Sequence, residues 1–168
     1  MQSVDDDGAA GATLERYALE GDSTTPIVAS MFRDRQNLTF SYSGLKAAVR
    51  RRVEMLPHEL SEKEKMDFAA GFQQAAFDQL LDRMHHALNR CRRRSLPIRQ
   101  FVVCGGVASN QTLVKRIRRE LEPFVDVVVP PRHLCQDNGI MIAYAGLLKY
   151  QMGHRASSRI GFSDQWKL

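Results

Sequence analysis

Two apolar runs that each end in a polar corner and then a helical pattern lie between residues 101 and 146, and they constrain this chain most. The first run, residues 101–104, ends in Gly105 and Gly106 before a basic helical segment. The second run, residues 125–129, leads through two prolines to the sequence CQDNG and another helical stretch. A strand–helix–strand–helix order predicts parallel strands in an α/β fold.

Corners of this kind lie at the carboxyl ends of strands, where ligands of open α/β sheets bind. They also bring helix N-termini, which attract phosphates, to the same edge. Gly105 and Gly106 would let the backbone approach a ligand closely, or would simply form a tight turn. Asn110 follows one turn later and either caps the next helix or contacts a ligand. Asp137 is likewise either a helix cap or a metal ligand.

Hydrophobic periodicity predicts the remaining elements. We expect helices over residues 13–20, 45–55, 61–94, 110–121 and 138–150, and strands over residues 38–42, 100–104 and 125–129. Ser61 and Glu64 form a capping-box pattern at the start of the longest helix. Its expected core stripe consists of Phe68, Ala69, Phe72, Ala75, Ala76, Leu80, Met84 and Leu88. Residues 23–37 are expected to form a loop with a short strand, and residues 153–168 an irregular tail.

Composition indicates an intracellular globular protein. At 168 residues the chain suits one ordinary domain. No apolar run approaches the roughly 18 residues of a membrane span, so we expect no membrane partner. The acidic start resembles neither a secretory signal nor a transit peptide. Three cysteines without paired spacing are typical of reduced thiols inside the cell.

The positive charge is unevenly distributed. Residues 1–22 hold six acids and one arginine, so residues 23–168 carry a net charge of +10. The bases gather at residues 46–52, 90–94 and 115–119. Such clusters favour a polyanionic partner. They are equally compatible with solvated helix ends, because arginine and lysine suit helix C-termini.

Motifs of common catalytic and metal sites are absent from the sequence. It contains no HExxH, HxxxH or CxxC pattern, so the chain cannot assemble a full metal site unaided. It also lacks a Walker loop and a GxSxG elbow. We therefore assign no catalytic residue, and the adjacent His85 and His86 are expected at the surface rather than as ligands.

Three segments together resemble one family. FSYSGLK at residues 40–46 resembles an FSFSGLK signature, and CGGVASN at residues 104–110 resembles GGVAxN. Residues 130–143, from the two prolines through CQDNGIMIA, resemble PPxxxCTDNxxMIA. In this order and spacing they resemble the tRNA threonylcarbamoyladenosine transferases, once called O-sialoglycoprotein endopeptidases or glycoproteases. The VASN and CxDNGIMIA sequences are closer to those of the bacterial and mitochondrial branch than to the archaeal and eukaryotic cytosolic branch.

The resemblance implies an actin/Hsp70-like (ASKHA) nucleotide-binding fold. It implies transfer of a threonylcarbamoyl group from threonylcarbamoyl-adenylate to N6 of the adenosine beside the anticodon of tRNA. In the family pattern Asn110 contacts the nucleotide-like ligand beside Gly105 and Gly106, and Asp137 binds an iron or zinc ion. Gly11 falls in a segment that resembles a GGPxxE ligand loop, although Ala10 and Ala12 replace its first Gly and its Pro.

Family members are much longer, and the resemblance, over residues 10–152, corresponds to their second half. The first half carries the HxxxH metal ligands, so this chain is expected to hold half of a composite site and to be inactive alone. Residues 1–22 would be an acidic segment with a remnant of the ligand loop, residues 23–152 the C-terminal lobe, and residues 153–168 the tail.

Expected partners are tRNA, the adenylate, and the missing N-terminal lobe or partner subunits. A lone half should also expose an apolar face that favours a homodimer. The compartment would be mitochondrial or cytoplasmic. An alternative is a non-catalytic nucleotide- or tRNA-binding module from a truncated or split gene. A protease activity rests only on the older family name.

Overall fold

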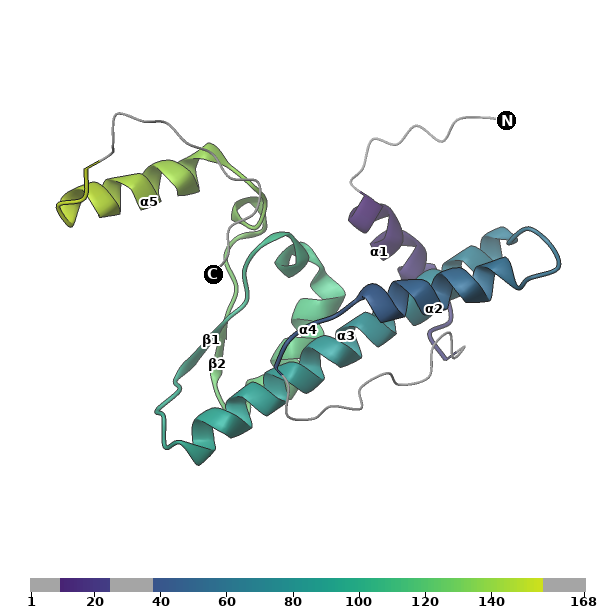
Figure 1. Cartoon of the computed structure of the whole chain (residues 1–168), viewed down its shortest axis with the longest axis horizontal. Helices are drawn as coiled ribbons and strands as arrows, with labels where there is room; N and C mark the ends of the chain where they lie inside the picture. The colour runs from purple at the N-terminus through teal and green to yellow at the C-terminus, as the bar shows by residue number, and fades with distance from the viewer. Residues whose placement is uncertain (1–9, 25–37, 156–168) are drawn as a thin grey trace.

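A helix of 32 residues, α3, Glu62–Arg93, forms the spine of the molecule (Figure 1). The computed structural model describes residues 10–24 and 38–155. The Ser61 hydroxyl accepts a hydrogen bond from the Glu64 backbone N–H, and the Glu64 carboxylate accepts one from the Ser61 N–H. The predicted capping box and the predicted end of the helix near Arg94 are both confirmed.

The other elements follow the predicted order, apart from the strand expected over residues 38–42 and the unpredicted 3-10 helices (η). They are α1, Ala10–Glu20; α2, Ser43–Glu54; β1, Gln100–Val102; η1, Gly106–Ser109; α4, Gln111–Leu121; β2, Asp126–Val128; η2, Arg132–Leu134; and α5, Gly139–Gln151. The strands pair in parallel, with Gln100 opposite Asp126 and Val102 opposite Val128. The predicted α/β class and parallel pairing are therefore confirmed.

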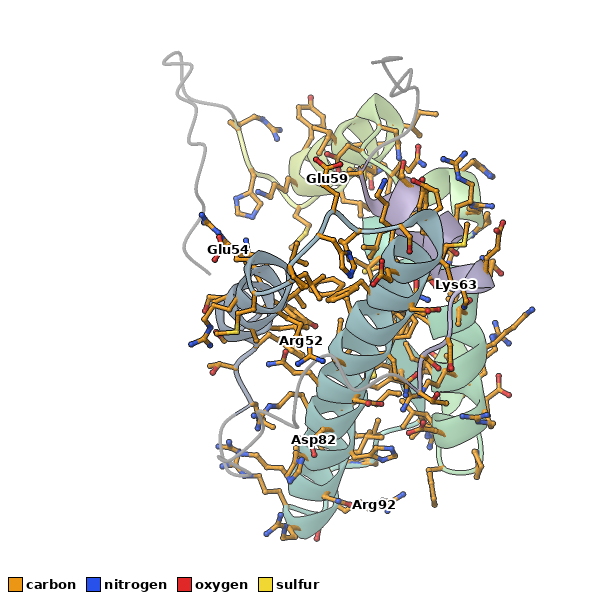
Figure 2. All side chains as sticks on the ribbon, turned by 90° about the vertical axis from the view of Figure 1, so that its right-hand side faces the viewer. Arg52, Glu54, Glu59, Lys63, Asp82 and Arg92 are labelled. Atoms are coloured by element: carbon orange, nitrogen blue, oxygen red, sulfur yellow. The ribbon has the colours of Figure 1, made fainter. Side chains whose placement is uncertain are left out.

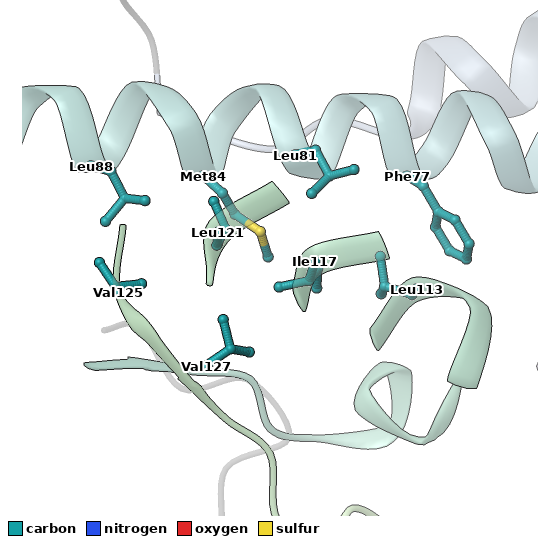
Figure 3. Packing of buried hydrophobic residues seen from close by; sticks show 9 residues of the cluster. All are labelled: Phe77, Leu81, Met84, Leu88, Leu113, Ile117, Leu121, Val125 and Val127. Carbon is teal, nitrogen blue, oxygen red and sulfur yellow. The ribbon is translucent and has the colours of Figure 1, made fainter. Parts of the chain in front are cut away.

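The core lies where α4 and β2 pack against one face of α3 (Figure 3). Leu113, Ile117 and Leu121 of α4 are fully buried there. Truncating such a side chain to alanine typically costs about 2–5 kcal/mol. The α3 side of this core is formed by Phe77, Leu81, Met84 and Leu88. The predicted stripe is confirmed at Ala69, Met84 and Leu88, whereas Phe72 and Ala76 are only half-buried and line a pocket.

The predicted strand over residues 38–42 is wrong. These residues have no regular structure and lead directly into α2. The Ser41 carbonyl accepts a hydrogen bond from the Gln79 side chain at 3.0 Å. Alternating polarity needs a neighbouring strand to become a ladder, and in the described sheet β1 and β2 pair only with each other. Ser43 and Gly44, between that expected strand and the helix expected from residue 45, begin α2. Residues 25–37 and 156–168 of the expected loop and tail lie outside the described residues.

Helix α1 packs against the first half of α3. Ala18 meets Ala69 and Ala70 in a small apolar cluster, flanked by Leu14 and Tyr17. The Tyr17 hydroxyl donates to Glu62 at 3.1 Å. This packing holds the first turn of α1, with Gly11, near the middle of α3.

Helix α5 differs from the other α-helices because none of its residues is buried. It stands apart from α3 and the sheet in Figure 1. The prediction of an exposed apolar face is confirmed for this helix. None of the helices over residues 10–24 and 38–155 combines the length and apolarity needed to cross a bilayer.

Candidate functional site

A pocket of about 670 Å³ lies where α1, α3, η1 and the segment before α5 meet. Most of the residues singled out from the sequence reach it from these four separate segments. Its lining is formed by Gly11, Ala12, Leu14, Glu15, Phe72, Gln73, Ala76, Phe77, Gly106, Val107, Ser109, Asn110, Arg132, Cys135, Gln136 and Asp137. Gly11, Gly106, Asn110 and Asp137 are thus brought together, whereas Gly105 does not line the pocket.

The corner after β1 depends on Gly105 for its backbone conformation. Gly105 has φ +85° and ψ 177°, a region that is essentially restricted to glycine. A Cβ on Gly105 or Gly106 would meet no other atom within 4 Å. Gly105 therefore serves the turn, and Gly106 is the member of the pair in the pocket wall.

Asn110 is both a helix cap and a pocket residue. Its side-chain oxygen accepts a hydrogen bond from the Leu113 backbone N–H at 2.9 Å, so it caps α4. Its Nδ2 donates to Gln73 Oε1 at 3.0 Å. An Asn amide has two donor hydrogens and two acceptor lone pairs, so each end retains one further bond for a ligand. The two hydrogen bonds fix its orientation.

Gln73 was not identified from the sequence. It is only 7% exposed and lies on α3, within a segment that reads as core. A buried polar side chain that holds the orientation of a pocket residue is a contribution of tertiary packing, and no local pattern identifies it.

Asp137 precedes α5 but does not cap it. Asn138 is the cap, and its side chain accepts from the Met141 N–H at 2.9 Å. The expectation of Asp137 as a possible cap is therefore wrong. The Asp137 side chain is exposed at the pocket wall, and no described residue forms a hydrogen bond or ion pair with its carboxylate.

The pocket combines apolar walls with a few charges. Leu14, Phe72 and Phe77 provide the apolar surface. Arg132 is a cation in the wall, whereas Glu15 and Asp137 are carboxylates. Apolar walls with a small number of polar groups that fix orientation are typical of small-molecule sites.

The residues that the structure describes do not form a complete metal site by themselves. Residues 10–24 and 38–155 include no group of three His, Cys, Asp or Glu side chains placed to hold one ion. His85 Nε2 lies 3.0 Å from a Glu120 carboxylate oxygen, and His86 Nδ1 lies 2.7 Å from the Asp82 carbonyl. Both histidines are engaged in contacts between or within helices, and neither lines the pocket.

Comparison with known sequences identifies the family. The sequence model of the family described as tRNA N6-adenosine threonylcarbamoyltransferase matches residues 3–144. The chain belongs to this threonylcarbamoyltransferase family. The resemblance seen in the three motifs is thereby confirmed.

Three curated relatives with this name come from bacteria. The relative from Wolbachia sp. subsp. Brugia malayi is 32% identical over 158 residues, which cover 94% of this chain and 46% of the relative. The relative from Lacticaseibacillus casei is 37% identical, over 90% of this chain and 43% of its own length. The relative from Anaplasma phagocytophilum is 35% identical, over 92% of this chain and 45% of its own length. The chain therefore spans about half the length of the relatives that it matches.

Proposed function

We propose that this chain contributes part of the site at which a threonylcarbamoyl group passes from its adenylate to N6 of the adenosine beside the anticodon of tRNA. The transfer forms a bond between N6 and the carbamoyl carbon, breaks the bond from that carbon to the adenylate oxygen, and releases AMP and a proton. The convergence of Gly11, Gly106, Asn110 and Asp137 on one pocket carries this proposal.

The adenylate would use the two kinds of pocket surface. Its adenine ring fits against apolar side chains such as Phe72 and Leu14. Its phosphate fits near Arg132 and near the N-terminal end of α4, because a helix N-terminus favours an anion. Asn110, held by Gln73, would hydrogen-bond the nucleotide.

A divalent ion, iron or zinc, is the metal implied by the family. The donor set fits only as one ligand, Asp137, whose carboxylate has no partner among the described residues; the other ligands would come from elsewhere. Such an ion would polarise the carbamoyl carbonyl as a Lewis acid. Asp137 would contribute a carboxylate oxygen to the ion at the pocket wall, beside the end of η2.

The remaining half of the site belongs to the proposal as well. Residues 23–152 would be the C-terminal lobe of an actin/Hsp70-like fold, residues 1–22 a remnant of the ligand loop and residues 153–168 a tail. An N-terminal lobe or a partner subunit would complete the site, and a homodimer would be the alternative assembly. With a tRNA substrate, the protein would work in the cytoplasm or in a mitochondrion.

The isolated chain is predicted to be inactive, because a single carboxylate cannot hold a catalytic ion firmly. The test supplies the purified chain with threonylcarbamoyl-adenylate and an unmodified tRNA, and measures threonylcarbamoyladenosine by mass spectrometry of nucleosides. We expect no product above the protein-free reaction. Robust product formation by the chain alone would contradict the half-site.

Ligand binding tests the pocket directly, with two asparagines as a matched pair. Asn110 and Asn138 both cap a helix through the same hydrogen bond, but only Asn110 lines the pocket. We expect Asn110→Ala to weaken binding of a non-reactive threonylcarbamoyl-adenylate analogue at least tenfold, since about 1.4 kcal/mol corresponds to that factor. Asn138→Ala should leave this affinity unchanged. Calorimetric titration measures both.

A similar loss of affinity in both variants would mean that helix fraying causes the effect and that Asn110 does not contact the ligand. Absence of any binding to the unsubstituted chain would leave only the non-catalytic interaction module.

Asp137→Asn, compared with Asp126→Asn at the opposite end of the sheet, extends the same test to the metal. Only the Asp137 change should lower the affinity of the chain for Zn²⁺.

A further inference from the structure

The C-terminal end of α3 carries an unusual density of positive charge. Arg90, Arg92, Arg93 and Arg94 fall within five consecutive positions, and Arg99 lies just before β1. We call these five arginines the basic end. All five are exposed, and none forms an ion pair with any residue that the structure describes. Figure 2 shows Arg92 at this end of the helix, with Lys63 toward the other.

In each of the other two clusters at least one arginine is neutralised by a carboxylate, although Lys46, Arg51 and Arg52 of α2 also form no ion pair with a described residue. In α4, Arg116 is bound to Asp78 and Glu120, and Arg118 to Glu122. In α2, Arg50 is bound to Glu54. Beside the basic end, the Asp126 backbone N–H donates to the Arg99 carbonyl at 3.0 Å, and the Asp126 carboxylate forms no ion pair with a described residue.

Helix termination alone does not account for this charge. A cation near a helix C-terminus contributes about 0.3–1 kcal/mol, and the effect is confined to the last turn. Arg90, Arg93 and Arg94 have the i, i+3 and i, i+4 spacings that place side chains on one face, where like charges destabilise the helix. Several unpaired arginines on one face therefore cost stability in the free chain and are neutralised only by an anionic partner.

The chemistry of the cluster favours phosphates. It contains arginine and no lysine, and the planar guanidinium binds phosphate oxygens through two parallel hydrogen bonds. The Arg92 guanidinium lies 4.7 Å from the centroid of the Phe124 ring, which is itself exposed. Arginine planes and exposed aromatic rings are the surfaces on which unpaired RNA bases stack.

The position of the basic end sets the size of the partner. Gln73 in the pocket and Arg90 belong to the same continuous helix, and 17 residues at 1.5 Å each separate them by about 25 Å. This distance exceeds the screening length of about 8 Å at physiological salt, so the basic end cannot act on a mononucleotide in the pocket. A polynucleotide several nucleotides long can contact both the pocket and the basic end.

We propose that the basic end is a binding surface for the RNA backbone, which contacts phosphates of the tRNA about 25 Å from the pocket that receives the reacting adenosine. This inference rests on the proposed function for the identity of the RNA. It adds a second contact region with a separable role: the basic end holds the RNA, whereas the pocket holds the small-molecule donor.

The test uses the full chain and an in vitro transcript of a tRNA with adenosine beside its anticodon. Binding is followed by fluorescence anisotropy over a range of salt concentrations. We expect the triple variant Arg90→Gln, Arg93→Gln and Arg94→Gln to bind at least about tenfold more weakly, with a salt slope smaller by about two to three. It keeps Arg92 and its contact with Phe124. A matched triple variant, Lys46→Gln, Arg51→Gln and Arg52→Gln, removes equal charge from α2 and should change the slope by less than about one.

Three further measurements separate the outcomes. Arginine-to-lysine changes at positions 90, 93 and 94 should preserve most of the slope, and thermal unfolding should show all variants folded. Affinity for the adenylate analogue should be the same in the two glutamine variants and in the unsubstituted chain. Absence of donor binding by the unsubstituted chain would count against the proposed function, whereas loss of the slope difference between the variants would count against the basic end.

Equal losses in the two glutamine variants would reduce the basic end to general electrostatics and overturn the proposal. The exposed Phe124 also raises a membrane surface as the competing partner. Binding to vesicles of equal parts phosphatidylserine and phosphatidylcholine, lost in the Arg90/Arg93/Arg94 variant while tRNA binding is kept, would likewise overturn it.

Discussion

A single glycine permits the contact between α1 and α3. A Cβ on Gly21 would lie 2.0 Å from the Met66 carbonyl oxygen, far inside van der Waals contact. The backbones meet closely here, and the Asp22 N–H donates to the Asp67 carboxylate at 2.7 Å. Because α1 carries Gly11 and Leu14 to the pocket, this contact also positions one wall of the site.

Gly21→Ala is therefore predicted to destabilise the chain by about 2 kcal/mol, as overpacking forces α1 away from α3. Urea unfolding followed by circular dichroism measures the loss. Gly11→Ala, within α1, is the control, because a Cβ there meets no atom within 4 Å. Alanine should stabilise that position by up to about 1 kcal/mol. Equal midpoints for Gly21→Ala and the unsubstituted chain would mean that the close contact does not form in solution.

At the residue scale, the sequence indicated which residues matter but not how the structural and pocket roles are distributed among them. The sequence predicts Asn110 either as a helix cap or as a ligand contact, and its amide has the hydrogen-bonding capacity for both. Gly105 and Gly106 were treated as a pair, but only the first needs its backbone conformation and only the second reaches the pocket. Dihedral angles and buried partners such as Gln73 depend on tertiary packing, which adjacent residues do not encode.

At the element scale, a polar network joins α3 and α4 beside their apolar core. Glu120 lies at its centre, with His85 Nε2 at 3.0 Å and Arg116 Nε at 3.2 Å, and Arg116 also pairs with Asp78. Burial acts to raise the pKa of the Glu120 carboxyl, but hydrogen bonds from His85 and Arg116 outweigh it and lower that pKa. The network thus favours the charged form of Glu120 in the folded state.

A lowered pKa in the folded state fixes the sign of the pH dependence. The stabilisation by Glu120 is complete above the unfolded-state pKa of about 4.3 and is lost as pH falls through the lower folded-state value. We expect Glu120→Gln to cost about 1 kcal/mol at pH 7, and this cost to shrink toward zero at strongly acidic pH. Chemical unfolding at several pH values measures both quantities.

Glu122→Gln is the control for this prediction. Glu122 pairs with Arg118 four residues earlier, at an exposed position, and such pairs contribute about 0.3–0.5 kcal/mol. A pH-independent cost of Glu120→Gln would show that the side chain acts by packing rather than by charge.

Elements with their own local signals could be predicted, and those that need a partner could not. The capping box at Ser61 and the polar corner at Asn110 opened helices as expected. The alternating residues 38–42 formed no strand, since alternation records a half-buried surface and not the presence of a neighbour. β1 and β2 are shorter than the predicted strands. The apolar runs extend beyond the residues that pair in the ladder.

At the scale of the whole molecule, α5 is the largest departure from a self-contained domain. Helices that are apolar on all sides are typical of protein interiors, yet α5 lies outside the core. Its exposed large side chains are Ile140, Met141, Ile142, Tyr144, Leu147, Leu148 and Tyr150. Lys149 is its only charged residue. The chain spans about half the length of its relatives. Helix α5 has the composition of a buried helix, but residues 10–24 and 38–155 do not cover it.

The purified chain is therefore predicted to self-associate and to bind a hydrophobic dye through α5. Replacing Ile140 and Leu147, which lie on one face and are 75% and 51% exposed, by lysine should lower dye emission and shift sedimentation toward the monomer. The control replaces Leu19 and Met55, 68% and 80% exposed on α1 and at the end of α2, by lysine. This variant adds the same charge but leaves α5 intact, so it should still associate. A monodisperse chain that binds no dye would mean that α5 is covered in solution, and the two lysine variants would then behave alike.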